Sequence, residues 1–418
     1  MTTKLLTRLC AVALSAGLAC VLLAQAPAEA TQKKKQRTQK PAREVISVGR
    51  DGEAEARLIQ VYQFIGQGKS REALAYAQDL VKNHPNFHLA HLIYGDLLAA
   101  QVRPVRTLGD VPDTTAIKHA ALLAELREES LLRIKALRER PPPDSLPTQF
   151  LSLSAQNKHA IAVDASRSRL YLFENGATGL KLVADYYVSI GKSGIEKTIE
   201  GDLRTPLGVY FITSSLSPQS LKEFYGAGAL PINYPNPYDV RRGKTGSGIW
   251  LHGTPPTQFS RAPRATDGCV VLANPDLQRL LTTVQARSTP VVIAPSLQWA
   301  TTQSLRADSR SFEETLQAWR QAKSSGKLDN ALAFYAPDFS SYGKTLAIWS
   351  GSLGLEMERA NGSALQIKDL SLLRWSDQAE TMVVTFNEVW QGSKTGSLKR
   401  QYWVRQANQW KIFFEGSI

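Results

Sequence analysis

The spacing of apolar residues changes twice along the chain and predicts three folded domains. Between residues 50 and 140, apolar side chains recur every three or four positions, which predicts helices. Between residues 157 and 296, short apolar runs alternate with turn residues, which predicts a mostly β domain. Residues 308–418 begin with an amphipathic helical pattern and continue as long strand-like runs, which predicts an α+β domain. The segment 141–156 starts with three prolines and is predicted to be a linker.

The helical segment contains the order of residues found in one type of helical repeat. Gly66 and Gly68 predict a break after the first helix, Pro85 precedes a later one, and a further helix is predicted from about Thr115 to Arg138. Such repeats need neighbours to bury their faces. The segment is therefore either a module that docks a protein partner or dimerises, or a helical appendage packed on the rest of the chain. The residues that resemble a tetratricopeptide (TPR) unit are Tyr62, Gly66, Ala73, Ala77, Pro85 and Ala90.

The β segment contains short candidate strands and one helix. A hairpin-type turn is predicted at Asn175-Gly176, and a helix is predicted from about Asn274 to Gln285. The candidate strands cover residues 160–164, 169–173, 182–190, 209–212, 248–251, 270–272 and 291–293.

In the C-terminal segment, a helix from Ser311 to Ser324 is predicted to carry Phe312, Leu316 and Trp319 on one face. A second helix at about 328–335 is followed by predicted strands at 365–375, 380–391, 399–406 and 409–415. This order, with the motif Trp319, Phe334, Tyr335, Asp338 and Phe339, resembles the NTF2-like cone, a fold that forms a pocket. Asp338 is either a helix-end residue or an acid of that pocket.

Residues 1–30 have the pattern of a secretory signal peptide. Lys4 and Arg8 precede an apolar run that starts at Leu9, and Ala28-Glu29-Ala30 forms a cleavage site. The run is short for a membrane span, which needs about 20 residues, although an uncleaved anchor stays an alternative. A lipid anchor at Cys20 is disfavoured because the residues after it are still apolar. The sequence therefore predicts an exported protein of the periplasm or cell envelope.

Basic residues give the chain a formal net charge of +13, and many of them follow the signal peptide. Residues 31–49 form a basic leader, in which residues 31–43 hold six positive charges and no acid. Such a segment suits an anionic envelope surface, or it is a solvated leader without a partner. Nucleic acid is not an expected partner of an exported protein.

Cysteine usage singles out one residue. Cys10 and Cys20 would leave with the signal peptide, so that Cys269 is the cysteine kept by the mature chain. One cysteine cannot form an internal disulfide, and a free thiol is open to oxidation in an export compartment. A lone cysteine is ordinarily a buried, inert one, so its neighbours decide its role.

A histidine in the same segment would give this cysteine a base. Sixteen residues separate His252 from Cys269, and both lie beside predicted strands that would present them at one edge of a sheet. A histidine in contact with a cysteine can take its proton and leave a thiolate, which reacts quickly with iodoacetamide even at about pH 6. The N–H groups of Gly268 and Cys269 would then bind an oxyanion.

The sequence around this pair resembles the L,D-transpeptidase (YkuD) family over about residues 157–295. The matching segments are Gly246-Ser247-Gly248-Ile249-Trp250-Leu251-His252-Gly253, Thr266-Asp267-Gly268-Cys269 and, upstream, Gly201 to Tyr210 with its Thr-Pro pair. The resemblance implies an enzyme that acts on peptidoglycan stem peptides. Such enzymes attack the bond between the L-centre of the diamino acid and D-alanine through an acyl-enzyme.

The resemblance also implies a role for each residue of the motif. Cys269 would be the nucleophile, and His252 would be the base and then the acid. The Gly253 carbonyl would orient the imidazole, Gly268 would help to bind the oxyanion, and Thr266 would fix the substrate-binding loop. No cofactor and no metal ion is implied.

One position departs from the crosslinking members of the family. Many of them have arginine two residues after the cysteine, where this chain has Val271. Transfer to a second stem peptide is therefore in doubt. The order of the three domains, and the segments around Tyr234 and His252, resemble the cell-shape L,D-carboxypeptidases, in which water takes the acyl group.

A segment between the two motifs would form a lid over the site. It runs from Ser217 to Gly243, and Tyr234 and Arg242 are its predicted substrate-binding residues. Arg242, with Arg241 and Lys244, would meet a carboxylate of the stem peptide. The alternative is that these cations form a solvated basic loop.

Two other classes of function stay open. In a non-catalytic envelope binding or scaffold protein, the helical and NTF2-like domains would hold partners, and the Cys–His pair would be a remnant. In a metal enzyme, His84, His88 and His91 would chelate zinc. No acid or cysteine in helical register completes that set, and Pro85 interrupts it.

Overall fold

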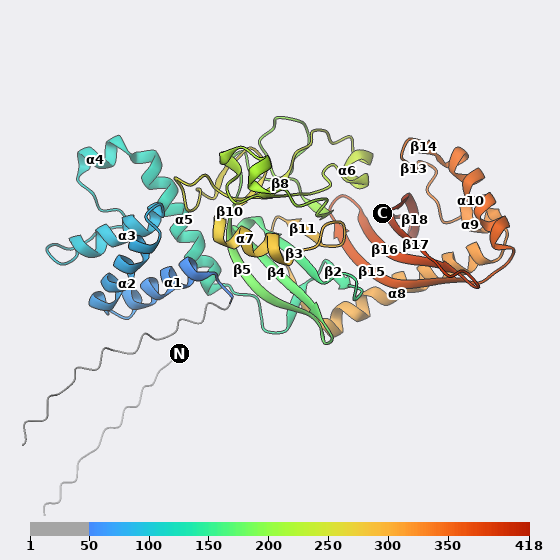
Figure 1. Cartoon of the computed structure of the whole chain (residues 1–418), viewed down its shortest axis with the longest axis horizontal. Coiled ribbons are helices and arrows are strands. Elements are labelled where there is room, and N and C mark those ends of the chain that lie inside the picture. The colour runs from blue at the N-terminus through green and yellow to red at the C-terminus, as the bar shows by residue number, and fades with distance from the viewer. Residues whose placement is uncertain (1–49) are drawn as a thin grey trace, which may run out of the picture. The chain divides into compact units, whose positions relative to one another are not determined.

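The computed structural model describes residues 50–418 (Figure 1). The predicted signal peptide (1–30) and basic leader (31–49) lie outside the described residues. Within residues 50–418, no helix combines the length and the apolar character that a bilayer crossing requires. The predicted fold class is confirmed: a helical region, a β-rich domain and an NTF2-like domain follow one another along the chain.

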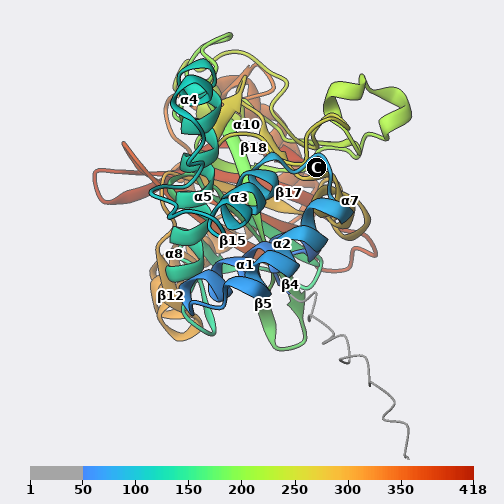
Figure 2. The ribbon, with the colours of Figure 1, turned by 90° about the vertical axis from the view of Figure 1, so that its left-hand side faces the viewer.

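The helical region forms where the three- and four-residue spacing predicts it. Apolar residues of the first three helices, such as Leu58, Leu80 and Ile93, share one buried cluster. Figure 2, which looks onto this region, shows α1 and α2 side by side. The helices are α1 (Glu53–Gly66), α2 (Ser70–Asn83), α3 (His88–Ala99), α4 (Asp113–Lys118) and α5 (Ala120–Arg138).

The helix predicted from Thr115 to Arg138 is two helices. At His119 the backbone leaves the α-helical range, with φ −118° and ψ 26°. Helix α4 buries none of its residues, whereas α5 buries Leu123, Leu126 and Ala136. Core packing thus fixes the direction of α5, whereas no buried residue of α4 holds it in line with α5.

The β-rich domain is built on a nine-stranded sheet with the order β6-β11-β3-β4-β5-β10-β8-β7, to which β9 is added by pairing with β5. All the candidate strands are present, whereas β7 and β9, of three residues each, were not predicted. The strands are β3 (His159–Asp164), β4 (Arg169–Gly176), β5 (Gly179–Gly191), β6 (Gly208–Phe211), β7 (Ala229–Pro231), β8 (Trp250–His252), β9 (Arg264–Thr266), β10 (Val270–Leu272) and β11 (Pro290–Ala294).

Two local predictions in this domain can be checked against the register. The hairpin of β4 and β5 exists, but its turn lies two residues later than Asn175-Gly176, because Asn175 pairs with Leu180 and Gly176 with Gly179. The predicted helix after β10 is α7 (Asn274–Thr283), which buries Leu277 and Leu280.

A short helix that was not predicted, α6 (Pro237–Arg241), is capped by Asn236.

The C-terminal domain packs three helices with a five-stranded sheet of order β18-β17-β16-β15-β2. Helix α10 was not predicted, because Gly351 and Gly354 interrupt it and it buries only Leu353 and Met357. The elements are α8 (Thr302–Ser324), α9 (Leu328–Leu332), α10 (Leu346–Ala360), the two-residue strands β13 (Ser340–Ser341) and β14 (Lys344–Thr345), β15 (Leu365–Ser376), β16 (Glu380–Trp390), β17 (Ser397–Gln406) and β18 (Gln409–Ser417).

The segment expected to be a linker contributes strands of its own. Strand β1 (Ser145–Pro147) pairs with β12 (Trp299–Thr301), just before α8. Strand β2 (Phe150–Ser152) pairs with β15 and becomes an edge of the C-terminal sheet. The segment between the helical region and the β-rich domain is thus fastened to the C-terminal domain by backbone hydrogen bonds.

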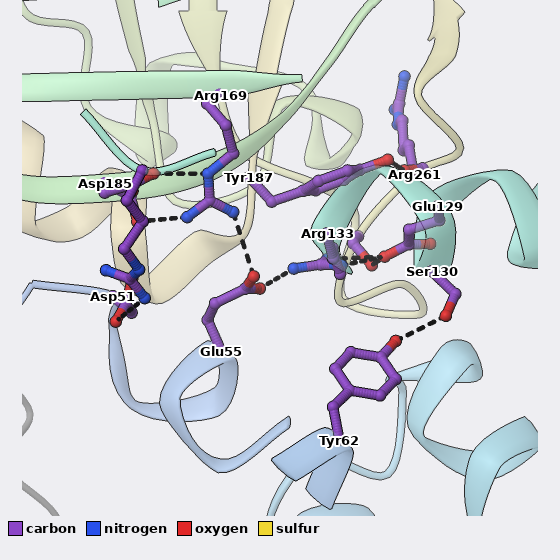
Figure 3. A network of polar contacts seen from close by, with 12 residues as sticks. Asp51, Glu55, Tyr62, Glu129, Ser130, Arg133, Arg169, Asp185, Tyr187 and Arg261 are labelled. Carbon is purple, nitrogen blue, oxygen red and sulfur yellow. Dashed lines mark hydrogen bonds and ion pairs between the residues drawn. The ribbon is translucent and has the colours of Figure 1, made fainter. Parts of the chain in front are cut away.

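A buried ion-pair cluster joins the helical region to the β-rich domain (Figure 3). Arg133 of α5 pairs with Glu55 of α1 and with Glu129, 2.6 Å away, and its guanidinium lies 3.9 Å from the ring centre of Tyr187 in β5. Glu55 also binds Arg169 of β4 at 3.1 Å. Buried charges are tolerated only when they are paired. This cluster therefore constrains the position of α1 and α5 against the sheet.

Replacing Arg133 with methionine is expected to destabilise the helical region. Glu129 would lose its counter-charge in a buried site, and breaking a buried pair in this way costs about 3 kcal/mol or more. Arg264→Gln is the control, because its ion pair with Glu128 is exposed on both sides and is worth about 1 kcal/mol or less. Urea unfolding followed by circular dichroism measures both; equal effects would contradict a structural role for the cluster.

Candidate active site

The pairing of two strands places the predicted nucleophile and base next to neighbouring strands of one sheet. Strand β10 runs parallel to β8, with Val270 opposite Leu251 and Val271 opposite His252. Cys269 therefore lies beside Trp250, and the Trp250 N–H donates to Cys269 Sγ at 3.4 Å. The expectation that neighbouring strands present both residues at one edge of the sheet agrees with this register.

His252 is held in one orientation. Its side chain is 2% exposed, and Nδ1 lies 2.8 Å from the carbonyl oxygen of Gly253. A carbonyl only accepts, so Nδ1 carries the proton and Nε2 is left as an acceptor. The rings of Tyr225 and Phe224, from the predicted lid, pack at 5.0 and 5.8 Å from the imidazole.

Burial shifts the pKa values of the histidine and the cysteine in the directions that favour their neutral forms. It lowers the pKa of His252 to about 4, against a smaller opposing effect of the Gly253 hydrogen bond. It raises the pKa of the Cys269 thiol, and the Trp250 N–H only partly offsets this. The thiol donates to the Gly248 carbonyl at 3.5 Å. These shifts favour a neutral thiol and a neutral imidazole over the thiolate–imidazolium pair expected from the sequence.

One threonine side chain shapes the loop before the nucleophile. The hydroxyl of Thr266 donates to the Cys269 carbonyl at 2.7 Å and accepts from the Gly268 N–H at 3.1 Å. Thr266 is 2% exposed, so these bonds are made away from water. These two hydrogen bonds support the expected role of Thr266 in fixing the loop.

Position 268 requires glycine for a structural reason, which differs from the oxyanion role expected from the sequence. Its φ is +123°, and an added Cβ would lie 2.7 Å from the carbonyl oxygen of Arg204. Its carbonyl accepts from the Thr205 hydroxyl at 2.9 Å, which links the upstream Thr-Pro motif to the site. Because its N–H is already bonded to Thr266, Gly268 cannot offer that group to an oxyanion in this arrangement. The Cys269 N–H is left as the candidate donor.

Asn274, at the start of α7, contacts the site, although the sequence predicted only that a helix begins there. Its Oδ1 accepts from the N–H groups of Ala227 and Thr254, at 2.8 and 3.2 Å, and its Nδ2 donates to the Thr254 carbonyl at 2.8 Å. It thus ties the lid to the turn after His252. The sequence signal, an Asn-Pro pair that opens a helix right after the nucleophile strand, is too common to have identified it.

The predicted substrate-binding residues of the lid are engaged within the protein. Tyr234 is 5% exposed, and its hydroxyl donates to the Thr245 carbonyl at 3.1 Å. Arg242 pairs with Asp377 of the C-terminal domain and lines a cavity of about 750 Å³ that also reaches Lys197. Contact of Tyr234 and Arg242 with substrate stays a prediction.

The basic neighbours of Arg242 are paired as well. Arg241 binds Asp338 at 2.6 Å, and Lys244 binds Asp239 at 2.8 Å. Asp338 thus lies at the contact with the β-rich domain, and the cations do not form a solvated loop.

The histidines considered for zinc have other contacts. His84 packs against Phe259 with ring centres 5.2 Å apart, and His91 Nε2 lies 3.0 Å from the Pro85 carbonyl. Over residues 50–418, no group of three or more His, Cys, Asp or Glu side chains is arranged to hold a metal ion.

Comparison with known families identifies two of the domains. Residues 158–293 match the L,D-transpeptidase catalytic domain (YkuD), and residues 311–416 match the Cds6 C-terminal NTF2-like domain. Both resemblances expected from the sequence are confirmed. A search of curated proteins finds no match to the chain.

Two solved structures share the fold over most of their length. Bd1075 of Bdellovibrio bacteriovorus is 24% identical, with a TM-score of 0.56, and the match covers 66% of this chain and 98% of that one. The helical cell shape determining protein Pgp2 of Campylobacter jejuni is 22% identical, with a TM-score of 0.52, and the match covers 65% of this chain and 95% of that one.

Alkylation of Cys269 is expected to depend on pH as a neutral thiol would. Because burial raises the pKa of this thiol, the thiolate fraction should keep rising above about pH 8.5, the ordinary midpoint for cysteine. The rate of iodoacetamide labelling, followed by mass spectrometry from about pH 5 to 10, measures this. A rate that has already levelled off near pH 6 would show a resting thiolate instead.

Thr266→Val should destabilise the loop before the nucleophile. The Gly268 N–H and the Cys269 carbonyl would lose a buried partner, which costs about 1–3 kcal/mol. Thr266→Ser keeps the hydroxyl and should stay close to the wild type. Urea unfolding and the labelling rate of Cys269 are the readouts. Equal results for the two variants would show that the Thr266 hydroxyl does not stabilise the loop.

Proposed function

Because residues 158–293 form a catalytic domain of the L,D-transpeptidase (YkuD) family, we propose that this chain is a cysteine enzyme of peptidoglycan stem peptides. It cleaves the bond between the L-centre of the diamino acid and the terminal D-alanine. The observation that carries the proposal is the orientation of His252: the Gly253 carbonyl holds Nδ1–H, which leaves Nε2 to accept the proton of the thiol that β10 places next to β8.

The reaction follows from these positions. Cys269 Sγ adds to the scissile carbonyl carbon while its proton passes to His252 Nε2. The N–H of Cys269 binds the resulting oxyanion. The C–N bond then breaks, His252 returns the proton to the leaving nitrogen, and D-alanine departs. A thioester on Cys269 remains.

The second half of the reaction needs an acceptor. Water or an amine adds to the thioester carbonyl and gives a proton to His252, and the restored thiol leaves with that proton. With water the product is a tripeptide stem, and with an amine it is a new amide bond. Val271 favours water, because it is 2% exposed in β10 and supplies no charge to an acceptor.

The likeness to Pgp2, described as a helical cell shape determining protein, supports a role in cell-wall biogenesis and cell shape. Residues 1–30 would export the chain to the periplasm or cell envelope, where its substrate lies. The basic leader would contact an anionic envelope surface, and the helical region would offer a docking face to a protein partner.

A digest tests the activity. The mature chain and Cys269→Ala are incubated with a disaccharide tetrapeptide, with and without an amine acceptor, and the products are read by mass spectrometry. We expect tripeptide and free D-alanine from the wild type and neither from the variant. Crosslinked or acceptor-exchanged stems would assign a transpeptidase instead.

The same digest can reject the enzyme. If the wild type and Cys269→Ala both leave the tetrapeptide intact, the catalytic role of Cys269 fails. The chain would then be an envelope binding or scaffold protein that uses its helical and NTF2-like domains.

A further inference from the structure

Within the part of the chain that the structure describes, one arginine near the nucleophile forms no ion pair. Arg261 lies in the segment between β8 and β9, and its guanidinium is 4.3 Å from the ring centre of Phe224, the residue that also packs on His252. Its backbone carbonyl accepts from the Tyr187 hydroxyl at 2.9 Å. In Figure 3 its side chain points away from the buried cluster around Arg133. A hydrogen bond thus holds the backbone of Arg261, while its guanidinium points away from the Arg133 cluster.

The space beside Arg261 is a cavity of about 380 Å³. One wall is the segment that holds Ser260 and Arg261, and the facing wall is α5 of the helical region, with Glu125, Leu126 and Glu129. Phe224 separates this cavity from the imidazole of His252. The helical region therefore completes a recess next to the reacting groups.

Three other cations in the segments around the nucleophile form ion pairs. Lys192 pairs with Asp267, Lys197 with Asp202 and Arg264 with Glu128. Glu129 accepts from Ser260 and Arg133. Among residues 50–418, Arg261 forms no ion pair, and its Nε is buried without a hydrogen-bond partner. Its positive charge acts on both His252 and Cys269.

The other cations expected to meet the substrate are not available. Arg241 and Arg242 pair with carboxylates of the C-terminal domain, and Lys244 pairs with Asp239. Position 271, two residues after the nucleophile, is a buried valine. Among the described residues, Arg261 thus stays available to a carboxylate, whereas Arg241, Arg242 and Lys244 do not.

We propose that Arg261 binds the terminal carboxylate of the stem peptide, on the leaving-group side of the scissile bond. This inference rests on the proposed function. That carboxylate is one residue from the carbonyl that Cys269 attacks, and a guanidinium offers it two parallel N–H donors. The ring of Phe224 holds the guanidinium plane. Glu125 is exposed on the facing wall, so the carboxylate would lie on the Arg261 side of the recess.

Two pairs of probes test this site in the full mature chain. The first pair is the tetrapeptide as its free acid and as its C-terminal amide. The wild type should prefer the acid, and Arg261→Gln should raise KM for the acid about tenfold, the scale of one charge-assisted bond, and leave the amide unchanged. Arg261→Lys, which keeps the charge but loses the two-donor fork, should recover part of the preference.

The second pair needs no peptide. Iodoacetate is an anion and iodoacetamide is neutral, so the ratio of their rates at Cys269 reports a cation near the thiol. This ratio should fall roughly threefold or more in Arg261→Gln, and the difference should shrink with added salt. Arg264→Gln is the matched control, because its cation is already paired, and it should keep the wild-type ratio. Equal melting temperatures confirm that the variants are folded.

The outcomes separate the two proposals. If Arg261→Gln keeps both the preference for the free acid and the wild-type rate ratio, the carboxylate site is overturned. If the wild type cleaves neither peptide, the proposed function fails, and the alkylation ratio still decides whether Arg261 draws anions to the thiol. An unchanged ratio in that case overturns the site as well.

Discussion

The parallel pairing of β8 with β10 is the constraint on which the site depends. Its register sets Cys269 beside Trp250, at the end of the sheet where His252 closes β8. Neither strand is longer than three residues, so this pairing needs support from outside. Thr266 and Thr205 supply it through the carbonyls of Cys269 and Gly268, and Asn274 supplies it through the turn after His252. The catalytic geometry is thus a property of the surrounding loops as much as of the strands.

Burial then decides the chemistry that this geometry can perform. The lid rings Phe224 and Tyr225 cover the imidazole, and the resulting loss of solvent lowers the pKa of His252 while it raises the pKa of Cys269. A neutral pair is less reactive toward oxidants than a thiolate.

The two flanking domains contact the catalytic domain through charges, in different ways. On the helical side, Glu55 and Arg133 form a buried cluster with Arg169, and α5 forms one wall of the recess at Arg261. On the C-terminal side, Asp338 and Asp377 neutralise the cations of the lid, and β2 joins the C-terminal sheet. The lid is therefore tied at one end to the site and at the other to the NTF2-like domain.

The sequence by itself determined the fold class and most strands, and it predicted the nucleophile and its base, because apolar periodicity and a contiguous motif are local properties of the chain. Burial, charge pairing and register depend on residues far apart, and only the tertiary structure decided them. It paired Arg242 with Asp377, 135 positions away, used the Gly268 N–H within its own loop, and placed Arg261 without an acidic partner among residues 50–418. The ion-pair partner of a basic residue cannot be identified from the sequence, because folding brings the two residues together.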